Sequence, residues 1–489
     1  MRQRDSHRMD AVYRYRGIAA IAAIPVLLIA AVLLLMPRGS PYAATDFTRT
    51  QPFSRTHFED GGGKVAGGGG AERYAIVIDA GSTGSRIHIF KFLESAAGEL
   101  QLQFDKFDQL QPGLSSYADD PPKAADSLGP LLALAEATIP KKQQAATTIS
   151  VGATAGLRLL GVEKADLILQ EVRTWLRKHP FKFEDDDVKI LSGVDEGAFA
   201  WLTLNYLLGH LSGSEQDTVA SIDLGGGSVQ EAFAMTPAEA KAVPNKDYLT
   251  ELKSGGKTFY VYVYRHVHVW VWSLCGAEVE QRKARVGYLG YGLMAGRAAV
   301  LSEEGLEAGH PCVPTGHSGN YTYGGKLMQM KAHKDGTSQD ACEKVVLAAL
   351  KHQAECGAPQ LQCSFNGAWG GPRVPKVFYI SSYFWDRATD AGLIVDANIN
   401  QQDVTPKEFG SLAAKACSSK LDDLGAAFPS VKEDIRPFFC LDLAYAHILL
   451  TKGFKIPEEA SIRLVKRVQY NGDLIEAAWP LGAAINALG

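Results

Sequence analysis

The chain has 489 residues, of which 46% are hydrophobic and 21% are charged, and this length exceeds what one hydrophobic core usually supports, so we expect two lobes. A formal net charge of −4 and a sequence pI of about 6.3 give no sign of a nucleic-acid-binding surface. The composition is otherwise that of an ordinary globular protein.

An apolar segment near the N-terminus is the first departure from that composition. Residues 17–36 are twenty residues without a charge, and as a helix they would span about 30 Å, the hydrocarbon core of a bilayer. Several arginines precede them, so the positive-inside rule predicts a cytosolic tail at residues 1–16 and the rest of the chain across the membrane. A cleaved signal peptide is the alternative, although its apolar region would be only about 7–15 residues long. We interpret residues 17–36 as the transmembrane signal anchor of a single-pass type II membrane protein.

The stretch after this segment is typical of a flexible stalk. Residues 37–70 are polar and irregular, and they end in two runs of glycine. From residue 71 the chain becomes strand-rich, so we expect the globular part to begin there.

A hairpin with an unusual turn follows. The apolar run 74–78 and the alternating run 87–92 predict two strands. Between them the chain reads Asp79-Ala80-Gly81-Ser82-Thr83-Gly84-Ser85-Arg86. Glycine amides and hydroxyl groups in such a turn can hold a phosphate, and an aspartate at a strand end suits a hydrated divalent cation. Alone, the pattern also fits an ordinary glycine and serine turn.

The same pattern occurs a second time. Residues 219–233 again run from a strand through an aspartate and a turn of small residues into a second strand. The aspartate is Asp223, and the turn contains Gly225, Gly226, Gly227 and Ser228. Two such hairpins predict one nucleotide held between two duplicated lobes.

Two further stretches between the hairpins carry reactive groups. Thr154 follows the predicted strand 147–151 and is either part of a phosphate site or a helix N-cap. Asp195 and Glu196 lie in a glycine-flanked loop ahead of the helical stretch 198–208. Phosphoanhydride hydrolysis needs a base for the attacking water, which Glu196 can supply. The alternative is a solvated acid that is favoured by a helix N-terminus.

Five segments of the chain, in order, resemble the conserved regions of the apyrases, the ecto-nucleoside triphosphate diphosphohydrolase family. They are residues 79–86, 152–158, 191–197, 222–231 and 479–483. Residues 437–443 and 476–482 look closest to the plant apyrase branch. The resemblance runs from about residue 71 to the C-terminus.

The resemblance implies an α/β fold of two RNase-H-like lobes of the actin/sugar-kinase type, with the active site in the cleft between the lobes. Lobe I would contain residues 71–192 and be completed by about 456–489, which would carry Trp479 towards the cleft. Lobe II would contain residues 193–455.

The resemblance also implies roles for single residues. Glu196 would be the general base, Ser228 and Gln230 would position the water, and Thr154 would lie nearby. Asp79 and Asp223 would hold Ca²⁺ or Mg²⁺ through water. The phosphate-binding residues would be Gly81, Ser82, Thr83, Gly84, Ser85, Arg86, Gly225, Gly226, Gly227 and Ser228. Val229 departs from the family, where many members carry a hydroxyl group, and we expect a lost phosphate contact there.

An aromatic-rich segment, residues 378–387, corresponds to a part of the family that stacks on the nucleobase. Most of its aromatic residues fit a core, and we expect Phe384 or Trp385 to be the one that stacks. Stacking tolerates any base, so this predicts broad nucleotide use.

All seven cysteines lie after residue 255, and none forms a C-x-x-C pair, which argues against zinc. The resemblance implies the disulfides Cys312–Cys342, Cys356–Cys363 and Cys417–Cys440, and it leaves Cys275 without a partner. Asn320 begins the single N-glycosylation motif of the chain, which requires a luminal domain, as disulfides do.

One segment does not fit the family. Residues 265–286 intervene where relatives connect a strand directly to a segment like 288–293. The segment begins with alternating valines and tryptophans, ends in a charged run and contains Cys275. We interpret it as a surface insertion without a role in catalysis.

These observations predict a membrane-anchored apyrase that binds nucleoside tri- and diphosphates, converts NTP to NDP and then to NMP, and binds no nucleic acid. The anchor favours the Golgi membrane with a luminal catalytic domain, or alternatively the plasma membrane with an extracellular one. Three alternatives are an exopolyphosphatase, a non-catalytic nucleotide-binding scaffold or sensor, and a sugar kinase.

Overall fold

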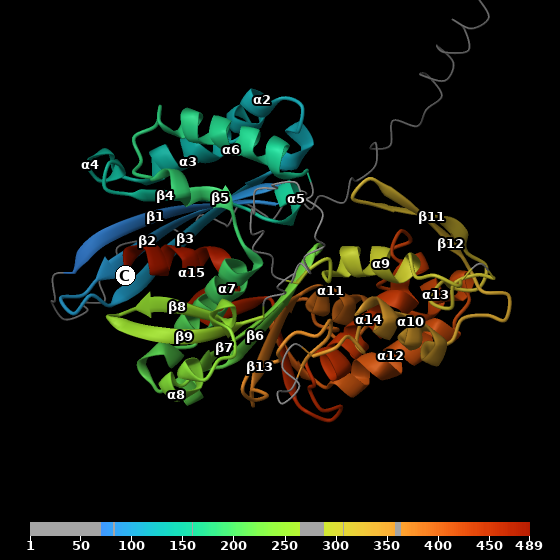
Figure 1. Ribbon diagram of the computed structural model, residues 1–489. Coiled ribbons are helices and arrows are strands. Elements are labelled where there is room, and N and C mark those ends of the chain that lie inside the picture. The colour runs from blue at the N-terminus through green and yellow to red at the C-terminus, as the bar shows by residue number, and fades with distance from the viewer. Residues whose placement is uncertain (1–69, 82–83, 159, 265–287, 307, 357–362) are drawn as a thin grey trace, which may run out of the picture. The chain divides into compact units, whose positions relative to one another are not determined.

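The computed structural model describes residues 70–489 except 82–83, 159, 265–287, 307 and 357–362 (Figure 1). The predicted anchor, the stalk up to residue 69 and the predicted insertion therefore lie outside the described residues, and so does Cys275. Among the helices in the described part, none is long and apolar enough to cross a membrane.

A five-stranded sheet in the order β3-β2-β1-β4-β5 forms the first half of the globular part. β1 (Ala71–Ala80), β2 (Ser85–Glu94) and β3 (Leu100–Leu110) are antiparallel neighbours. β4 (Thr148–Ala153) runs parallel to β1, and β5 (Val188–Ile190) runs parallel to β4. The predicted hairpin is therefore β1–β2, and its first strand is the central one.

Side chains of β1 and β2 alternate between two apolar layers, as the period of a strand requires. Ile76 and Ile89 face α3 (Gly129–Thr138) and α6 (Val162–Leu176) within one buried cluster. Val77 belongs to a second cluster, which also contains residues of α7 (Gly193–Leu207) and α15 (Trp479–Leu488). Both faces of the sheet are thus covered by helices (Figure 1).

An eight-stranded sheet forms the second half, with the path β14-β15-β13-β6-β7-β9-β8 and with β10 paired to β7. At its centre β6 (Ala220–Leu224) and β7 (Ser228–Met235) form the second predicted hairpin, and β13 (Phe378–Ser382) runs parallel to β6. The other strands are β8 (Leu249–Ser254), β9 (Lys257–Val263), β10 (Tyr288–Leu289), β14 (Gln401–Val404) and β15 (Ile462–Val465).

Helices again cover both faces of this sheet. The cluster that contains α7 and α15 also contains Phe259, Val261 and Val263 of β9, so these two helices lie between the two sheets (Figure 1). The other face packs against helices whose bounds are α9 (Leu293–Leu301), α10 (Gln339–Ala349), α11 (Tyr383–Asp390), α12 (Pro406–Ser418) and α14 (Phe439–Ile448).

The helix α15 packs closely on α7. The backbone N–H of Gly482 donates to Thr203 Oγ1 at 2.7 Å. A Cβ atom on Gly482 would lie 2.0 Å from the carbonyl oxygen of Phe199, so only glycine allows this approach. α15 also contacts β1 and β2. β15, by contrast, belongs to the second sheet, so residues 456–489 are shared between the two halves and do not all complete lobe I as expected.

Shorter elements complete the described part. They are α2 (Pro121–Asp126), α4 (Lys141–Gln144), α5 (Ala155–Arg158), α8 (Pro237–Lys241), α13 (Leu421–Ala427), β11 (Ser318–Tyr323), β12 (Lys326–Lys331), β16 (Arg467–Tyr470) and β17 (Asp473–Glu476). The disulfides Cys312–Cys342, Cys356–Cys363 and Cys417–Cys440 are all present, which confirms the three predicted pairs.

Candidate active site

The two aspartates of the paired hairpins occupy equivalent places in the two sheets. Asp79 is next to last in β1, opposite Gly152 of the parallel strand β4. Asp223 is next to last in β6, opposite Ser381 of the parallel strand β13. The structure therefore supports the duplication that the sequence predicted.

Both aspartates have a buried oxygen without a hydrogen-bond partner among the described residues. Arg86 Nη1 lies 3.2 Å from Asp79 Oδ2, while Asp79 Oδ1 and Asp223 Oδ1 have no such contact. Burial raises the pKa of both carboxyl groups. Carboxylate oxygens are the ligands that hard divalent cations prefer, directly or through water, so these two residues fit a Ca²⁺ or Mg²⁺ ion.

Glu196 lies in the first turn of α7 and contacts two other residues. Arg158 Nη2 donates to its Oε2 at 2.8 Å, and Gln230 Nε2 donates to the same oxygen at 3.3 Å. Gln230 Nε2 also donates to Ser228 Oγ at 2.8 Å. The structure thus brings together Glu196, Ser228 and Gln230 as the sequence predicted, and it adds Arg158.

The surroundings of Glu196 favour a base that works near neutral pH. Burial is the main cause that raises its pKa, to about 7, and the charges of Asp223 and Asp79 add to the effect while Arg158 opposes it. A base with a pKa near the working pH transfers protons most efficiently.

The turn of the first hairpin retains its predicted form in the residues that are described. Gly81 N–H donates to the Gly84 carbonyl at 2.9 Å and closes the turn. The hydroxyl group of Ser85 is buried without a hydrogen-bond partner among the described residues. Ser82 and Thr83 lie outside the described residues.

The turn of the second hairpin is held by the start of α9. Gly225 N–H donates to the Ser228 carbonyl at 3.0 Å, and Leu293 N–H donates to the Gly225 carbonyl at 2.9 Å. A Cβ atom on Gly292 would lie 2.3 Å from the Ser228 backbone nitrogen, so this segment packs directly on the turn. Residues 288–293 have no predicted role in the site from sequence alone, because their apolar and glycine pattern also fits an ordinary connection.

Two more predicted residues flank the first turn. Thr154 N–H donates to the Ala80 carbonyl at 3.2 Å, which sets Thr154 beside Asp79. Trp479 is buried, and a Cβ atom on Gly152 would lie 2.6 Å from its ring. Because Gly152 is the register partner of Asp79, Trp479 packs beneath the strand end that carries this aspartate.

Two expectations about the site are wrong. Val229 is completely buried in the apolar cluster on the opposite face of β7 from Ser228 and Gln230, so no phosphate contact is lost there. Phe384 is also completely buried and packs edge-on against Phe409 at 6.0 Å, and Trp385 is 6% exposed in the same cluster. Neither of these aromatic rings is available to stack on a base.

The residue just before them lies at the site instead. Tyr383 is half-buried, and its ring carbon Cε2 is 3.9 Å from the position of a Cβ atom on Gly226. Ser382 before it has φ of 62°, and the hydroxyls of Ser382 and Ser381 oppose the raised pKa of Asp223. The serine pair at the end of the predicted strand, Ser381 and Ser382, is the sequence signal that could have placed this strand end, and with it Tyr383, at the site.

Comparison with known proteins decides the family. Residues 69–488 match the GDA1/CD39 (nucleoside phosphatase) family. The chain belongs to this family. It is therefore a phosphohydrolase of the nucleoside phosphatase class, as the resemblance had implied, and its mixed α/β fold is the one that the family predicted in coarse form.

Several relatives match this nucleoside phosphatase along most of its length. It is 39% identical to "Probable apyrase 1" of Oryza sativa subsp. japonica over 97% of this chain and 94% of the relative. It is 34% identical to "Guanosine-diphosphatase" of Saccharomyces cerevisiae over 85% of this chain and 80% of the relative. A solved structure of nucleoside triphosphate hydrolases from Neospora caninum covers 86% of this chain and 92% of its own, with a TM-score of 0.58 and 16% identity, which shows a shared fold.

Proposed function

We propose that this nucleoside phosphatase is an apyrase that removes the terminal phosphate from nucleoside tri- and diphosphates. The observation that carries the proposal is the contact of Glu196 with Gln230, which in turn contacts Ser228, beside two aspartates that each have an unpartnered buried oxygen. The relatives named apyrase and guanosine-diphosphatase support the substrate class.

In the reaction, Ser228 and Gln230 hold a water in line with the terminal phosphorus, and Glu196 accepts its proton. A new bond forms between the water oxygen and the terminal phosphorus, and the bridging phosphorus–oxygen bond breaks. The shortened nucleotide and inorganic phosphate leave, and Glu196 returns its proton to solvent. Repetition of these steps converts NTP to NDP and then to NMP.

Asp79 and Asp223 would hold a Ca²⁺ or Mg²⁺ ion through water, and Gly81, Gly84–Arg86 and Gly225–Ser228 would hold the phosphates. A cation held there would neutralise charge on the phosphate oxygens. Arg86 can reach either Asp79 or a phosphate, because its contact with Asp79 is long for a charged pair at 3.2 Å.

Tyr383 is the residue that we assign to the nucleobase in place of Phe384 and Trp385. Its half-buried ring lies next to the Gly226 turn, where the phosphates would be held. A single aromatic platform supplies stacking energy to any base, so we expect hydrolysis of several nucleotides at comparable rates.

We also propose that the enzyme is a type II membrane protein with its catalytic part in the lumen of the secretory pathway, in the Golgi or at the cell surface. The apolar residues 17–36 support the anchor. The three disulfides support an oxidising compartment. Asn320 is exposed on β11, where a glycan can be attached.

The test of the reaction is the variant Glu196→Gln, with Asp195→Asn as the matched control in the same helical turn. We expect Glu196→Gln to lose about 10²–10⁴-fold in kcat for ATP and ADP, the usual value of general base catalysis, with KM little changed. Asp195→Asn should keep wild-type kcat. Phosphate release from nucleotides and from inorganic polyphosphate, with Ca²⁺ or Mg²⁺, measures both. Retention of a tenth of the activity in Glu196→Gln, or faster turnover of polyphosphate, would overturn the proposal.

A further inference from the structure

Arg158 makes an ion pair that the proposed reaction does not itself require. Arg158 is the last residue of α5, directly after β4 of the first sheet, and Glu196 belongs to α7 between the sheets. The side chains are 9% and 14% exposed, and Arg158 Nη2 lies 2.8 Å from Glu196 Oε2. A buried ion pair at this distance fixes the position of both groups.

The remaining donors of Arg158 are costly for a purely structural residue. Arg158 Nε and Nη1 are buried and have no hydrogen-bond partner among the described residues. A buried polar group without a partner is destabilising, so a smaller or apolar side chain would suit a purely structural role better. The ion pair with Glu196 is the contact that accounts for an arginine at this position.

The two donors that reach Glu196 contact only one of its oxygens. Arg158 and Gln230 both donate to Oε2. Neither contacts Oε1, which is the oxygen left to accept a proton from water. The carboxylate is thus held in one orientation with its reactive oxygen free.

The charges around Glu196 come from several elements. Asp79 at the end of β1 and Asp223 at the end of β6 both raise its pKa, and Arg158 of α5 lowers it. Burial raises the pKa of Tyr323 on β11, and the charge of Arg158 opposes this increase. Gln230 of β7 is the neutral neighbour.

We infer that Arg158 is a positioning residue that holds Oε2 of Glu196 and directs its Oε1 towards the attacking water. The inference rests on the proposed role of Glu196 as the base. It adds a residue that touches neither the substrate nor the reacting atoms and acts through Glu196.

The sign of the pH effect follows from the charge. Because Arg158 lowers the pKa of Glu196, its removal raises that pKa above about 7. A charge at this distance typically shifts a pKa by about one to three units. The acidic limb of kcat/KM should therefore move to higher pH, and the loss of activity should be largest at acidic pH and shrink at alkaline pH.

The experiment compares Arg158→Gln and Arg158→Lys with the matched control Arg73→Gln, whose ion pair with Glu94 in the first sheet also spans 2.8 Å. We expect Arg158→Gln to move the acidic limb up by at least about one pH unit and to lower kcat at pH 7 about 10–100-fold, with KM changed less than about threefold. Arg158→Lys should keep the limb near the wild-type position, because the charge remains, and recover part of kcat. Arg73→Gln should leave the profile unchanged.

The double variant Arg158→Gln/Glu196→Gln separates this inference from the proposed function. If Arg158 acts through Glu196, adding Arg158→Gln to Glu196→Gln should change the residual rate less than about threefold. An unmoved acidic limb, a KM that rises with kcat unchanged, or full additivity in the double variant would each overturn the inference. Failure of the proposed function would show instead in Glu196→Gln alone, which would remain active.

Folding of the variants is checked by their thermal midpoints. Should Arg158→Gln not fold, Arg158→Lys still decides. If Arg158 only packs, the acidic limb of the kcat/KM profile and kcat should change together in Arg158→Lys. The inference instead predicts that Arg158→Lys has a wild-type acidic limb and a reduced kcat.

Discussion

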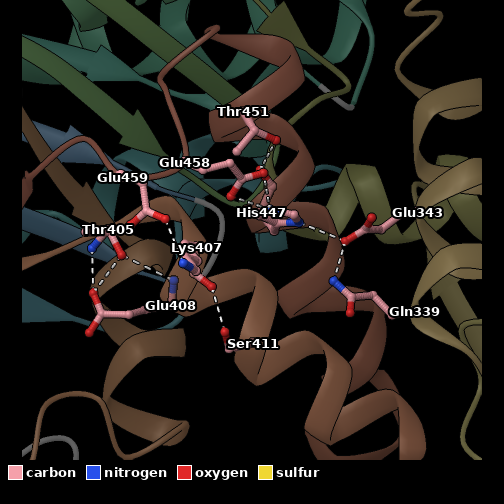
Figure 2. A network of polar contacts seen from close by, with 10 residues as sticks. All are labelled: Gln339, Glu343, Thr405, Lys407, Glu408, Ser411, His447, Thr451, Glu458 and Glu459. Atoms are coloured by element: carbon pink, nitrogen blue, oxygen red, sulfur yellow. Dashed lines mark hydrogen bonds and ion pairs between the residues drawn. The ribbon is translucent and has the colours of Figure 1, made fainter.

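Two regions of this nucleoside phosphatase bury clusters of charged side chains, and they differ in whether the buried carboxylate oxygens have partners. In the helical layer beyond the second sheet, His447 Nδ1 lies 2.7 Å from Glu343 and Nε2 lies 3.1 Å from Glu458 (Figure 2). Nearby in the same layer, Asp442 is completely buried and contacts Arg297 and Arg387 at 2.5–2.8 Å. In the active site, Asp79 and Asp223 each have a buried oxygen with no such partner.

We interpret this difference as one between side chains that stabilise the fold and side chains that are placed to bind a ligand. Buried polar groups in folded proteins are almost always hydrogen-bonded, and a buried charge without partners is expensive. In the helical layer both carboxylate oxygens of Asp442 have partners, although Arg387 Nε is buried without one among the described residues, and the contacts of Asp442 and His447 join α9, α10, α11 and α14. Asp79 Oδ1 and Asp223 Oδ1 depart from this rule among the described residues, as the proposed cation site would require. Four predictions test this contrast.

The largest effect on stability should come from Asp442→Asn. The amide leaves Arg297 and Arg387 buried with a neutral partner, and breaking a buried ion pair typically costs about 3–5 kcal/mol. The thermal midpoint of the purified catalytic part should fall sharply, while the small fraction that remains folded keeps its nucleotide KM. A midpoint within a few degrees of wild type would show that this cluster is no more stabilising than the active-site carboxylates.

Asp223→Asn should do the opposite of Asp442→Asn: it should lower activity without lowering stability. We expect kcat to fall by about 10²–10³-fold, the usual loss when a charge-stabilising group is removed from an active site. In chelator, the thermal midpoint should stay the same or rise. Burial raises the pKa of Asp223, so its contribution to stability is present at low pH and lost as the pH rises through the folded-state pKa. The gain in Asp223→Asn should therefore be larger at pH 8 than at pH 5, and a uniform loss of stability would contradict the contrast.

A divalent cation should stabilise the wild type, because it would provide a partner for the unpartnered oxygens of Asp79 and Asp223. At a concentration of about one hundred times its Kd, a ligand that binds only the folded state adds about 2.7 kcal/mol. Thermal midpoints with and without Ca²⁺ or Mg²⁺ measure this without any turnover. The increase should be absent from Asp223→Asn and present in His447→Gln, and an equal increase in all three proteins would place the cation elsewhere.

His447→Gln should have the smallest effect, about 1 kcal/mol, because the pair is partly exposed at Glu458. Burial alone would lower the pKa of His447, but the contacts with Glu343 and Glu458 raise it. The stabilisation is therefore present below the ordinary histidine pKa and is lost as the pH rises through the folded-state value. The midpoint difference between wild type and variant should be larger at about pH 6 than at about pH 9, and a difference that grows at alkaline pH would contradict the assigned charge.

The sequence predicted those parts of the site that are encoded locally. The hairpin turns around Asp79 and Asp223, and Glu196 between two glycines, are short patterns whose chemistry can be read without the fold, although Glu196 lies in the first turn of α7 and not in the predicted loop. Ser228 and Gln230 were predicted from the family resemblance, and their alternation along β7 agrees with a place on one face. The anchor, the stalk and the insertion stay predictions, because they lie outside the described residues.

The parts that could not be predicted depend on tertiary contacts. Nothing in residues 152–158 shows that Arg158 meets Glu196, 38 residues later. The choice among Tyr383, Phe384 and Trp385 depends on where the helix α11 begins, since consecutive residues of a helix point in different directions. The division of residues 456–489 between the two sheets likewise follows from packing and not from periodicity.

The close crossing of α15 and α7 has a consequence for biosynthesis. α15 lies between the two sheets and brings Trp479 beneath the strand end that carries Asp79, yet it is made after every other described element. Chains fold as they leave the ribosome, with earlier segments first. One face of the first sheet therefore lacks the cover of α15 until this helix leaves the ribosome. A nascent chain that stalls before residue 479 should carry the β1–β2 and β6–β7 turns and still lack the helix that packs beneath Asp79.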